Sequence, residues 1–73
     1  MVTEGKISFT VECEKEEDGR WLAEVLELPG VLVYGQSPDE ARSRAEALGL
    51  RALADRLEHG EVPFPIEISF AFA

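Results

Sequence analysis

The sequence predicts an α+β fold, β-β-β-α-β, in which a four-stranded mixed sheet of order 3-2-1-4 carries one helix on one face. Three observations predict it. Residues 6–14 and 66–72 alternate apolar and polar side chains, as half-buried strands do. Turn residues separate the short apolar runs of residues 18–41. Residues 38–58 have apolar side chains at helical spacing. The chain is long enough for a single domain, residues 1–73.

The first two strands are expected to form an antiparallel hairpin. Residues 6–14 place their apolar side chains on one face. The Asp18-Gly19 pair that follows is a strong hairpin signal, so the run 20–28 returns beside the first strand.

Two hairpin registers are open. A two-residue loop pairs Val11 with Leu26, whereas a three-residue loop with Gly19 in the left-handed conformation pairs Val11 with Val25. The second register places apolar side chains opposite each other more consistently.

A third strand and a helix follow two further turn signals. Residues 28–31, Leu-Pro-Gly-Val, fit a type II turn, because Pro presets φ at its second position and Gly accepts the positive φ of the third. The third strand is expected from Val31 to Tyr34 or Gly35.

The helix is expected over residues 38 to about 57 or 58. Ser37 caps it, Pro38 takes the first helical position, and Glu40 is expected to reach back to the Ser37 amide. Gly60 can adopt the left-handed conformation that ends a helix.

The helix has two apolar stripes, although covering one sheet face needs only one. A second stripe therefore favours a second neighbour. The stripes are Ala41, Ala45, Leu48 and Ala52 and, on roughly the opposite side, Leu50, Ala54 and Leu57.

The last strand lies within residues 62–73 and is expected beside the first and parallel to it. Pro63 and Pro65 cannot donate ladder hydrogen bonds, so pairing is expected to start after them.

Composition limits the function classes. Asp and Glu number 15 against 7 Lys and Arg, a net charge of −8 that disfavours direct nucleic-acid binding. The acidic side chains of the first hairpin form either a solvated edge or a surface that attracts a basic protein. Cys13 is the only cysteine, which excludes an internal disulfide and fits a reducing cytoplasm. The chain shows neither a signal peptide at its start nor an apolar run of about 20 residues. We therefore expect a cytoplasmic, soluble protein that does not bind membranes.

The second and third strands are apolar on both faces, which antiparallel strands with one wet face normally are not. A second protein surface can cover the excess, and for so small a chain a homo-oligomer, dimer or larger, is expected. The alternative is that twist buries both faces within one chain. The candidate interface residues are Trp21, Leu22, Glu24, Leu26, Val33, Tyr34, Leu50 and Leu57.

Catalysis has little support in the sequence. Glu12 or Glu14, Glu46 and Glu67 occupy the elements that hold the metal-binding carboxylates of the ribonuclease H fold, but analogy of fold does not establish a site. His59 is explained by the helix end. No catalytic, cofactor-binding or metal-binding residue is predicted, and the chain is not expected to be an enzyme.

Residues 18–41 resemble the signature of the HicB-like antitoxin family. The family's Asp-Gly turn, aromatic residue, Ala-Glu-Val, Leu-Pro-Gly and Ser-Pro-x-Glu-Ala segments follow here in order. The matching positions are Asp18, Gly19, Trp21, Ala23, Glu24, Val25, Leu28, Pro29, Gly30, Gly35, Ser37, Pro38, Glu40 and Ala41. The resemblance implies a partial ribonuclease-H-like fold without the nuclease site, oligomerisation, and the masking of a small basic RNA-cleaving toxin of the HicA type.

One departure is that many members continue into a C-terminal DNA-binding segment, whereas this chain stops at Ala73. It therefore resembles a short form, for which no direct nucleic-acid binding is expected. The alternatives are a residual metal-dependent nuclease and an orphan oligomeric module that binds an unrelated protein.

Overall fold

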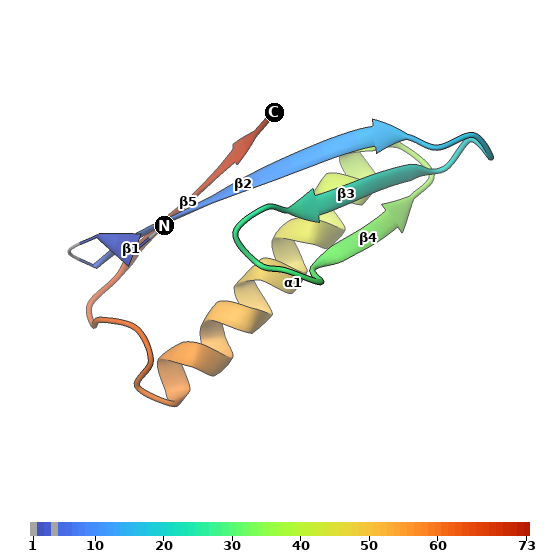
Figure 1. Ribbon diagram of the computed structural model, residues 1–73. Helices are drawn as coiled ribbons and strands as arrows, with labels where there is room; N and C mark the ends of the chain where they lie inside the picture. The colour runs from blue at the N-terminus through green and yellow to red at the C-terminus, as the bar shows by residue number, and fades with distance from the viewer. Residues whose placement is uncertain (1, 4) are drawn as a thin grey trace.

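The computed structural model describes residues 2–3 and 5–73, with the backbone alone for residues 2–3. Its sheet has the order β4-β3-β2-β5, and α1 covers one face (Figure 1). The predicted strands 1, 2, 3 and 4 are β2, β3, β4 and β5, so the α+β fold and the predicted order 3-2-1-4 are confirmed. The sequence did not predict the two-residue strand β1, which pairs with the start of β2. The elements are β1 (Val2–Thr3), β2 (Lys6–Lys15), β3 (Trp21–Val25), β4 (Leu32–Gly35), α1 (Pro38–Glu58) and β5 (Glu67–Phe72).

The β2–β3 hairpin has the second of the two expected registers. Val11 pairs with Val25. Gly19 has φ of +90° and donates its N–H to the Glu16 carbonyl at 3.0 Å. The left-handed glycine lets the loop close with one residue more than a two-residue turn, which sets the pairing of every later residue.

The Pro-Gly turn between β3 and β4 is also as expected. The Val31 N–H donates to the Leu28 carbonyl at 3.0 Å, and Gly30 has φ of +86°. These are the features of a type II turn. The strand that follows begins at Leu32, one residue later than predicted.

The start of α1 confirms the expected cap but not the expected return bond. Ser37 Oγ accepts the Glu40 N–H at 3.1 Å. The Glu40 carboxylate accepts the Gln36 N–H at 2.8 Å, and not the Ser37 N–H as predicted. Gln36 follows the last ladder pair of β4, so its N–H needs a partner and lies within reach of this carboxylate.

The end of α1 is a Schellman motif. Gly60, with φ of +69°, donates its N–H to Leu57, and the Glu61 N–H donates to Arg56. The left-handed glycine satisfies two of the last carbonyls of the helix and ends it.

The hydrophobic core lies between α1 and the strands β2, β3 and β4. The helix contributes small side chains to it, which lets the helix approach the sheet closely. Of the first predicted stripe, Leu48 and Ala52 are only half-buried, at its flank. The residues of α1 that are buried are Ala41, Ala45, Gly49 and Leu53, and those of the sheet and its loops are Ile7, Phe9, Val11, Ala23, Val25 and Leu28.

The last strand, β5, begins at Glu67, after both prolines, and runs parallel to β2 as expected. The Phe70 ring packs on the Phe9 ring, with centroids 5.3 Å apart, and touches α1 at Gly49. Beyond this contact α1 lies over β2, β3 and β4, so Ile68 and Phe72 are left largely exposed.

Within the described part of the chain, no helix combines the length and the apolarity that crossing a membrane would require. The predicted cytoplasmic location stays a prediction.

Candidate protein-binding face of the sheet

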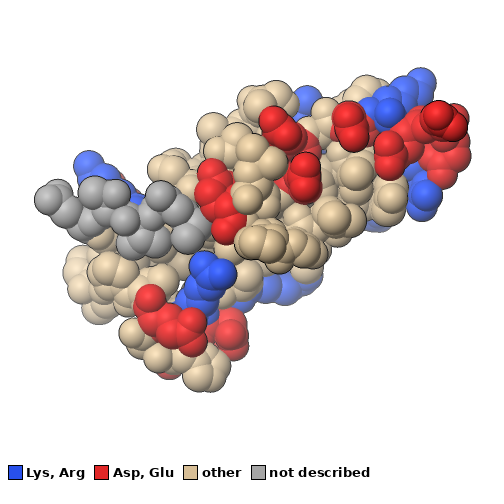
Figure 2. Space-filling model, in the orientation of Figure 1, with Lys and Arg blue, Asp and Glu red and all other residues tan. Residues whose placement is uncertain are grey.

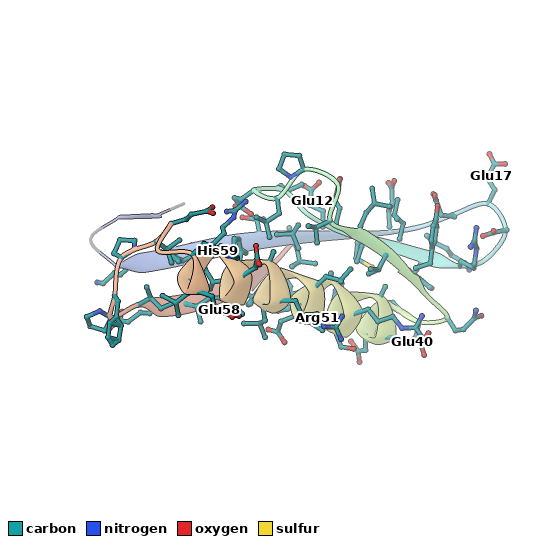
Figure 3. The ribbon with its side chains drawn as sticks, turned by 90° about the horizontal axis from the view of Figure 1, so that it is seen from below. Glu12, Glu17, Glu40, Arg51, Glu58 and His59 are labelled. Atoms are coloured by element: carbon teal, nitrogen blue, oxygen red, sulfur yellow. The ribbon has the colours of Figure 1, made fainter. Side chains whose placement is uncertain are left out.

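The face of the sheet opposite α1 has no covering element among the described residues, and we call it the open face. Strand alternation assigns side chains to it, because Ile7, Phe9 and Val11 of β2 are buried toward α1 and their neighbours point the other way. Figure 3 shows Glu12 on the side of the sheet away from α1. The open-face residues of β2, β3 and β4 are Lys6, Ser8, Thr10, Glu12, Glu14, Leu22, Glu24, Leu32 and Tyr34.

Four of the predicted interface residues belong to this face. Leu22 and Glu24 lie on it in β3, and Tyr34 lies on it in β4, paired with Leu22. Leu26 continues the alternation beyond β3: its N–H donates to the Thr10 carbonyl at 2.9 Å, and its side chain is 46% exposed. The structure therefore brings these four side chains to one surface.

The other four predicted residues lie elsewhere. Trp21 and Val33 point to the helix side, where they are partly buried against the core. Leu50 and Leu57 are exposed on α1, on the opposite side of the sheet from Leu22. The sequence-based set thus covers two separate surfaces and part of the core.

One apolar residue of the open face was missed. Leu32 pairs with Glu24 and is 48% exposed, so it extends the apolar strip of Leu22 and Tyr34 along β4. The run Val31–Tyr34 is apolar throughout, and alternation within it could not be read from the sequence. The position of the Pro-Gly turn was the signal that could have set the phase of this strand.

Three carboxylates that form no ion pair among the described residues border the apolar strip. Glu12 and Glu24 face each other directly across β2 and β3, and Glu14 lies opposite Leu22. Among the described residues, no ion pair includes Glu12, Glu14 or Glu24. Figure 2, which views this face, shows acidic side chains gathering toward the hairpin end. Like charges directly opposite each other destabilise a sheet, so this arrangement costs folding free energy.

These carboxylates line a shallow hollow of about 330 Å³. Leu22, Cys13 and Ala73 are the apolar residues that line the same hollow. An extended cationic side chain suits such a site, because its apolar stem can contact Leu22 while its charge meets the carboxylates.

Tyr34 is held in position at the other end of the strip. The Arg20 guanidinium lies 4.0 Å from the centroid of the Tyr34 ring, and Asp18 Oδ2 accepts from Arg20 Nε at 2.7 Å. A hydrogen bond from the Arg20 backbone N–H, and then the bond from its side chain, lower the pKa of Asp18. The Asp-Gly turn therefore fixes the cation that stacks on Tyr34, which reduces the entropy that this ring would lose on binding.

Glu27 clamps the loop after β3 to the middle of β2. Its carboxylate accepts the Thr10 N–H at 2.6 Å and the Thr10 hydroxyl at 2.8 Å. Burial raises the pKa of Glu27, but hydrogen bonds, chiefly the two from Thr10, act in the opposite direction, and the net pKa lies below the usual value of 4.5. The clamp holds Leu26 beside the apolar strip.

We expect Glu27→Gln to lower the free energy of unfolding by about 1 kcal/mol near neutral pH, because an amide oxygen replaces a charged acceptor. A carboxylate whose pKa is lowered by folding stabilises the folded state above its unfolded pKa, and this stability is lost as the pH falls through the folded pKa. Urea unfolding should therefore show that the free energy of unfolding decreases less between pH 7 and pH 3 for the variant than for the wild type. Glu17→Gln is the control, since Glu17 points away from the sheet at the hairpin tip (Figure 3). An equal acid loss in Glu27→Gln and wild type would contradict the clamp.

The carboxylates considered for a nuclease do not converge. Glu12 and Glu14 lie on the open face, Glu46 lies on α1 across the sheet, and Glu67 begins β5 beside Lys6. Over the ranges 2–3 and 5–73, no group of three His, Cys, Asp or Glu side chains is placed to hold a metal ion.

His59 lies at the end of α1, and Cys13 packs against the core. His59 is the C-cap of α1, and its Nδ1 lies 2.7 Å from the Asp55 carbonyl oxygen. The His59 Nδ1 also lies 3.5 Å from Asp55 Oδ1, one helical turn earlier in α1. Cys13 is half-buried against the core.

No family model, no curated protein and no solved structure matches this chain. The resemblances to the HicB-like family and to the ribonuclease H fold therefore stay predictions.

Proposed function

We propose that this chain is a non-enzymatic protein-binding module of the HicB-antitoxin type, which masks a small basic RNA-cleaving protein with its open face. The observation that carries the proposal is the joint arrangement on one uncovered face. An apolar strip of Leu22, Leu32 and Tyr34 lies beside Glu12 and Glu24, which have no compensating cation among the described residues. Apolar anchors next to paired carboxylates are the features of a surface for a basic partner. The cation on Tyr34, Arg20, is already paired with Asp18.

The chemistry of the face favours a basic protein over nucleic acid. Phosphates would be repelled by Glu12, Glu14 and Glu24, whereas Lys or Arg side chains would be attracted to them. Such a cation would also relieve the repulsion between Glu12 and Glu24, so part of the binding free energy is already present as strain in the unbound sheet. A toxin that binds RNA needs basic residues for that purpose, so covering them blocks its substrate site.

The test begins with the reading frame next to the gene for this chain. We expect that frame to encode a short basic protein that arrests growth alone, and that co-expression of this chain restores growth and gives a complex that co-purifies. Glu12→Gln with Glu24→Gln should weaken binding at least about tenfold and reduce its dependence on salt.

The matched control is Glu16→Gln with Glu17→Gln, which removes the same charge from the hairpin loop and should change binding little. Three results would overturn the proposal: no basic protein in the neighbouring frame, no complex between the two chains, or equal binding by the two double variants.

A further inference from the structure

The outer edge of β5 has backbone groups that no described strand satisfies. The Glu67 N–H donates to the Gly5 carbonyl at 2.7 Å, and the Ala73 N–H donates to the Val11 carbonyl at 3.0 Å. Residues of odd number in this strand therefore bond to β2, and those of even number turn their N–H and C=O groups to the other edge. These outward groups belong to Ile68, Phe70 and Phe72.

The opposite edge of the sheet, at β4, is protected. It is shorter, and Arg44 Nη1 donates to the Tyr34 carbonyl at 2.8 Å. The Val25 N–H bonds to the Val31 carbonyl, so by alternation the backbone groups of Tyr34 face outward, and Arg44 occupies an edge position. By contrast β5 contains no Lys, no Pro and no bulge, which are the usual means of preventing edge pairing.

The side chains along the β5 edge are apolar on the helix side. Ile68 is 37% exposed and Phe72 is 48% exposed. Leu50 and Leu57 are also exposed on α1: Leu50 follows Gly49, which lies against Phe70, and Leu57 is about two helical turns further on. The other flank of the helix, at Leu48, lies beside Val33 of β4. The second apolar stripe of the helix and the last strand thus border the same uncovered region.

The low charge of this edge favours a second copy of this chain as its binding partner. The protein has a net charge of −8, so two copies repel each other over most of their surfaces. Residues 62–73 contain one charged side chain, Glu67. An identical acidic chain can approach β5 with little repulsion, whereas a basic partner would find more attraction at the open face.

We propose that β5 pairs antiparallel with β5 of a second copy, with Phe70 opposite Phe70 on a two-fold axis. In this register every outward backbone group of the strand gains a partner, because Ile68 lies opposite Phe72 and both are residues whose N–H and C=O face the edge. The apolar side chains of the two strands then meet on the helix side.

The same register separates the two Glu67 side chains, because each lies opposite Ala73 of the other copy and not opposite its own equivalent. The result is one continuous sheet with both α1 helices on one face. Both open faces stay uncovered, so this assembly does not depend on the proposed partner, and each proposal can fail without the other.

The first test is the mass of the protein in solution at micromolar concentration. Light scattering should give about twice 8.1 kDa for the wild type. Ile68→Lys with Phe72→Lys should weaken association more than about a hundredfold, because charges at an edge oppose strand pairing. Leu26→Lys with Leu32→Lys changes two equally exposed side chains on the open side and should leave the dimer intact. Circular dichroism will confirm that both variants are folded.

A monomeric wild type would overturn the proposal. So would a dimer that survives the β5 changes and dissociates with the changes at Leu26 and Leu32, since the second copy would then occupy the open face.

The second test is the register. In a Cys13→Ser background, Ser69→Cys with Ala71→Cys places each new thiol opposite the other across the two-fold axis, at the short Cα separation of a non-hydrogen-bonded pair. Mild oxidation should give a covalent dimer with the double change and little with Ser69→Cys alone. Equal cross-linking of the two, or none, would overturn the pairing.

Discussion

Phe9→Ala is expected to unfold a large fraction of the protein at room temperature. Phe9 lies in the middle of β2, is 1% exposed and packs on Phe70 beneath α1. Removing a buried Phe ring costs about 3–5 kcal/mol, and a single core of this chain length rarely supplies more than about 3–5 kcal/mol. The expected cost therefore equals most of the stability that the fold can have.

Phe64→Ala is the matched control, because it removes the same ring from a side chain that is 80% exposed. We expect a change within about 0.5 kcal/mol for it. Urea unfolding followed by circular dichroism at low protein concentration will compare the two, since association would add stability to the folded state. If Phe9→Ala unfolds at the same urea concentration as Phe64→Ala, Phe9 does not lie in the core.

Most elements of the fold could be predicted from local sequence patterns. Strict alternation predicted β2, and Ser37 with Gly60 predicted both ends of α1. The Asp-Gly signal predicted the hairpin but left two registers open, of which the structure has the one with Gly19 in the left-handed conformation. Each of these features depends on a few neighbouring residues whose conformational preferences are strong. The same preferences would act in a protein of any function.

The candidate surfaces were harder to predict. They depend on which side chains of an apolar strand face the helix and on which strands the helix covers. Trp21 and Leu22 are neighbours with similar composition around them, yet one packs on the core and the other lies on the open face. The hydrogen bond between Thr10 and Glu27 joins residues 17 positions apart, and no local sequence pattern predicts it. The exposure of β5 follows from the position of α1 over the other strands, which is a property of the assembled sheet.

The positions that resemble the HicB-like family lie mostly away from the open face. The matched positions lie almost entirely in turns, in the helix cap and in the core; among them only Glu24 has its side chain on the open face. The resemblance therefore speaks mainly for the fold. The exposed apolar side chains of Leu32 and Tyr34 on the open face support a partner independently of it, together with the carboxylates of Glu12 and Glu24.

Gly35 shows why one of these matched positions is glycine. It ends β4, pairs with Trp21 and lies against the start of α1. A Cβ atom on Gly35 would stand 2.5 Å from the Ala41 nitrogen and 2.9 Å from the Ala41 Cα. These are backbone atoms of the first helical turns, so they cannot move aside without shifting the helix.

We expect Gly35→Ala to lower the free energy of unfolding by about 1–3 kcal/mol, the usual cost of forcing extra atoms into a packed site. Gly30→Asn is the control: Gly30 has φ of +86° but nothing within 4 Å of its would-be Cβ, and Asn tolerates the left-handed conformation. Thermal unfolding should show a clear loss for Gly35→Ala and a small one for Gly30→Asn. The reverse order would mean that the space beside Ala41 does not require glycine at the end of β4. The expected order would instead identify close contact between strand and helix as the requirement, because Gly35 is the point where the sheet determines how near α1 can pack.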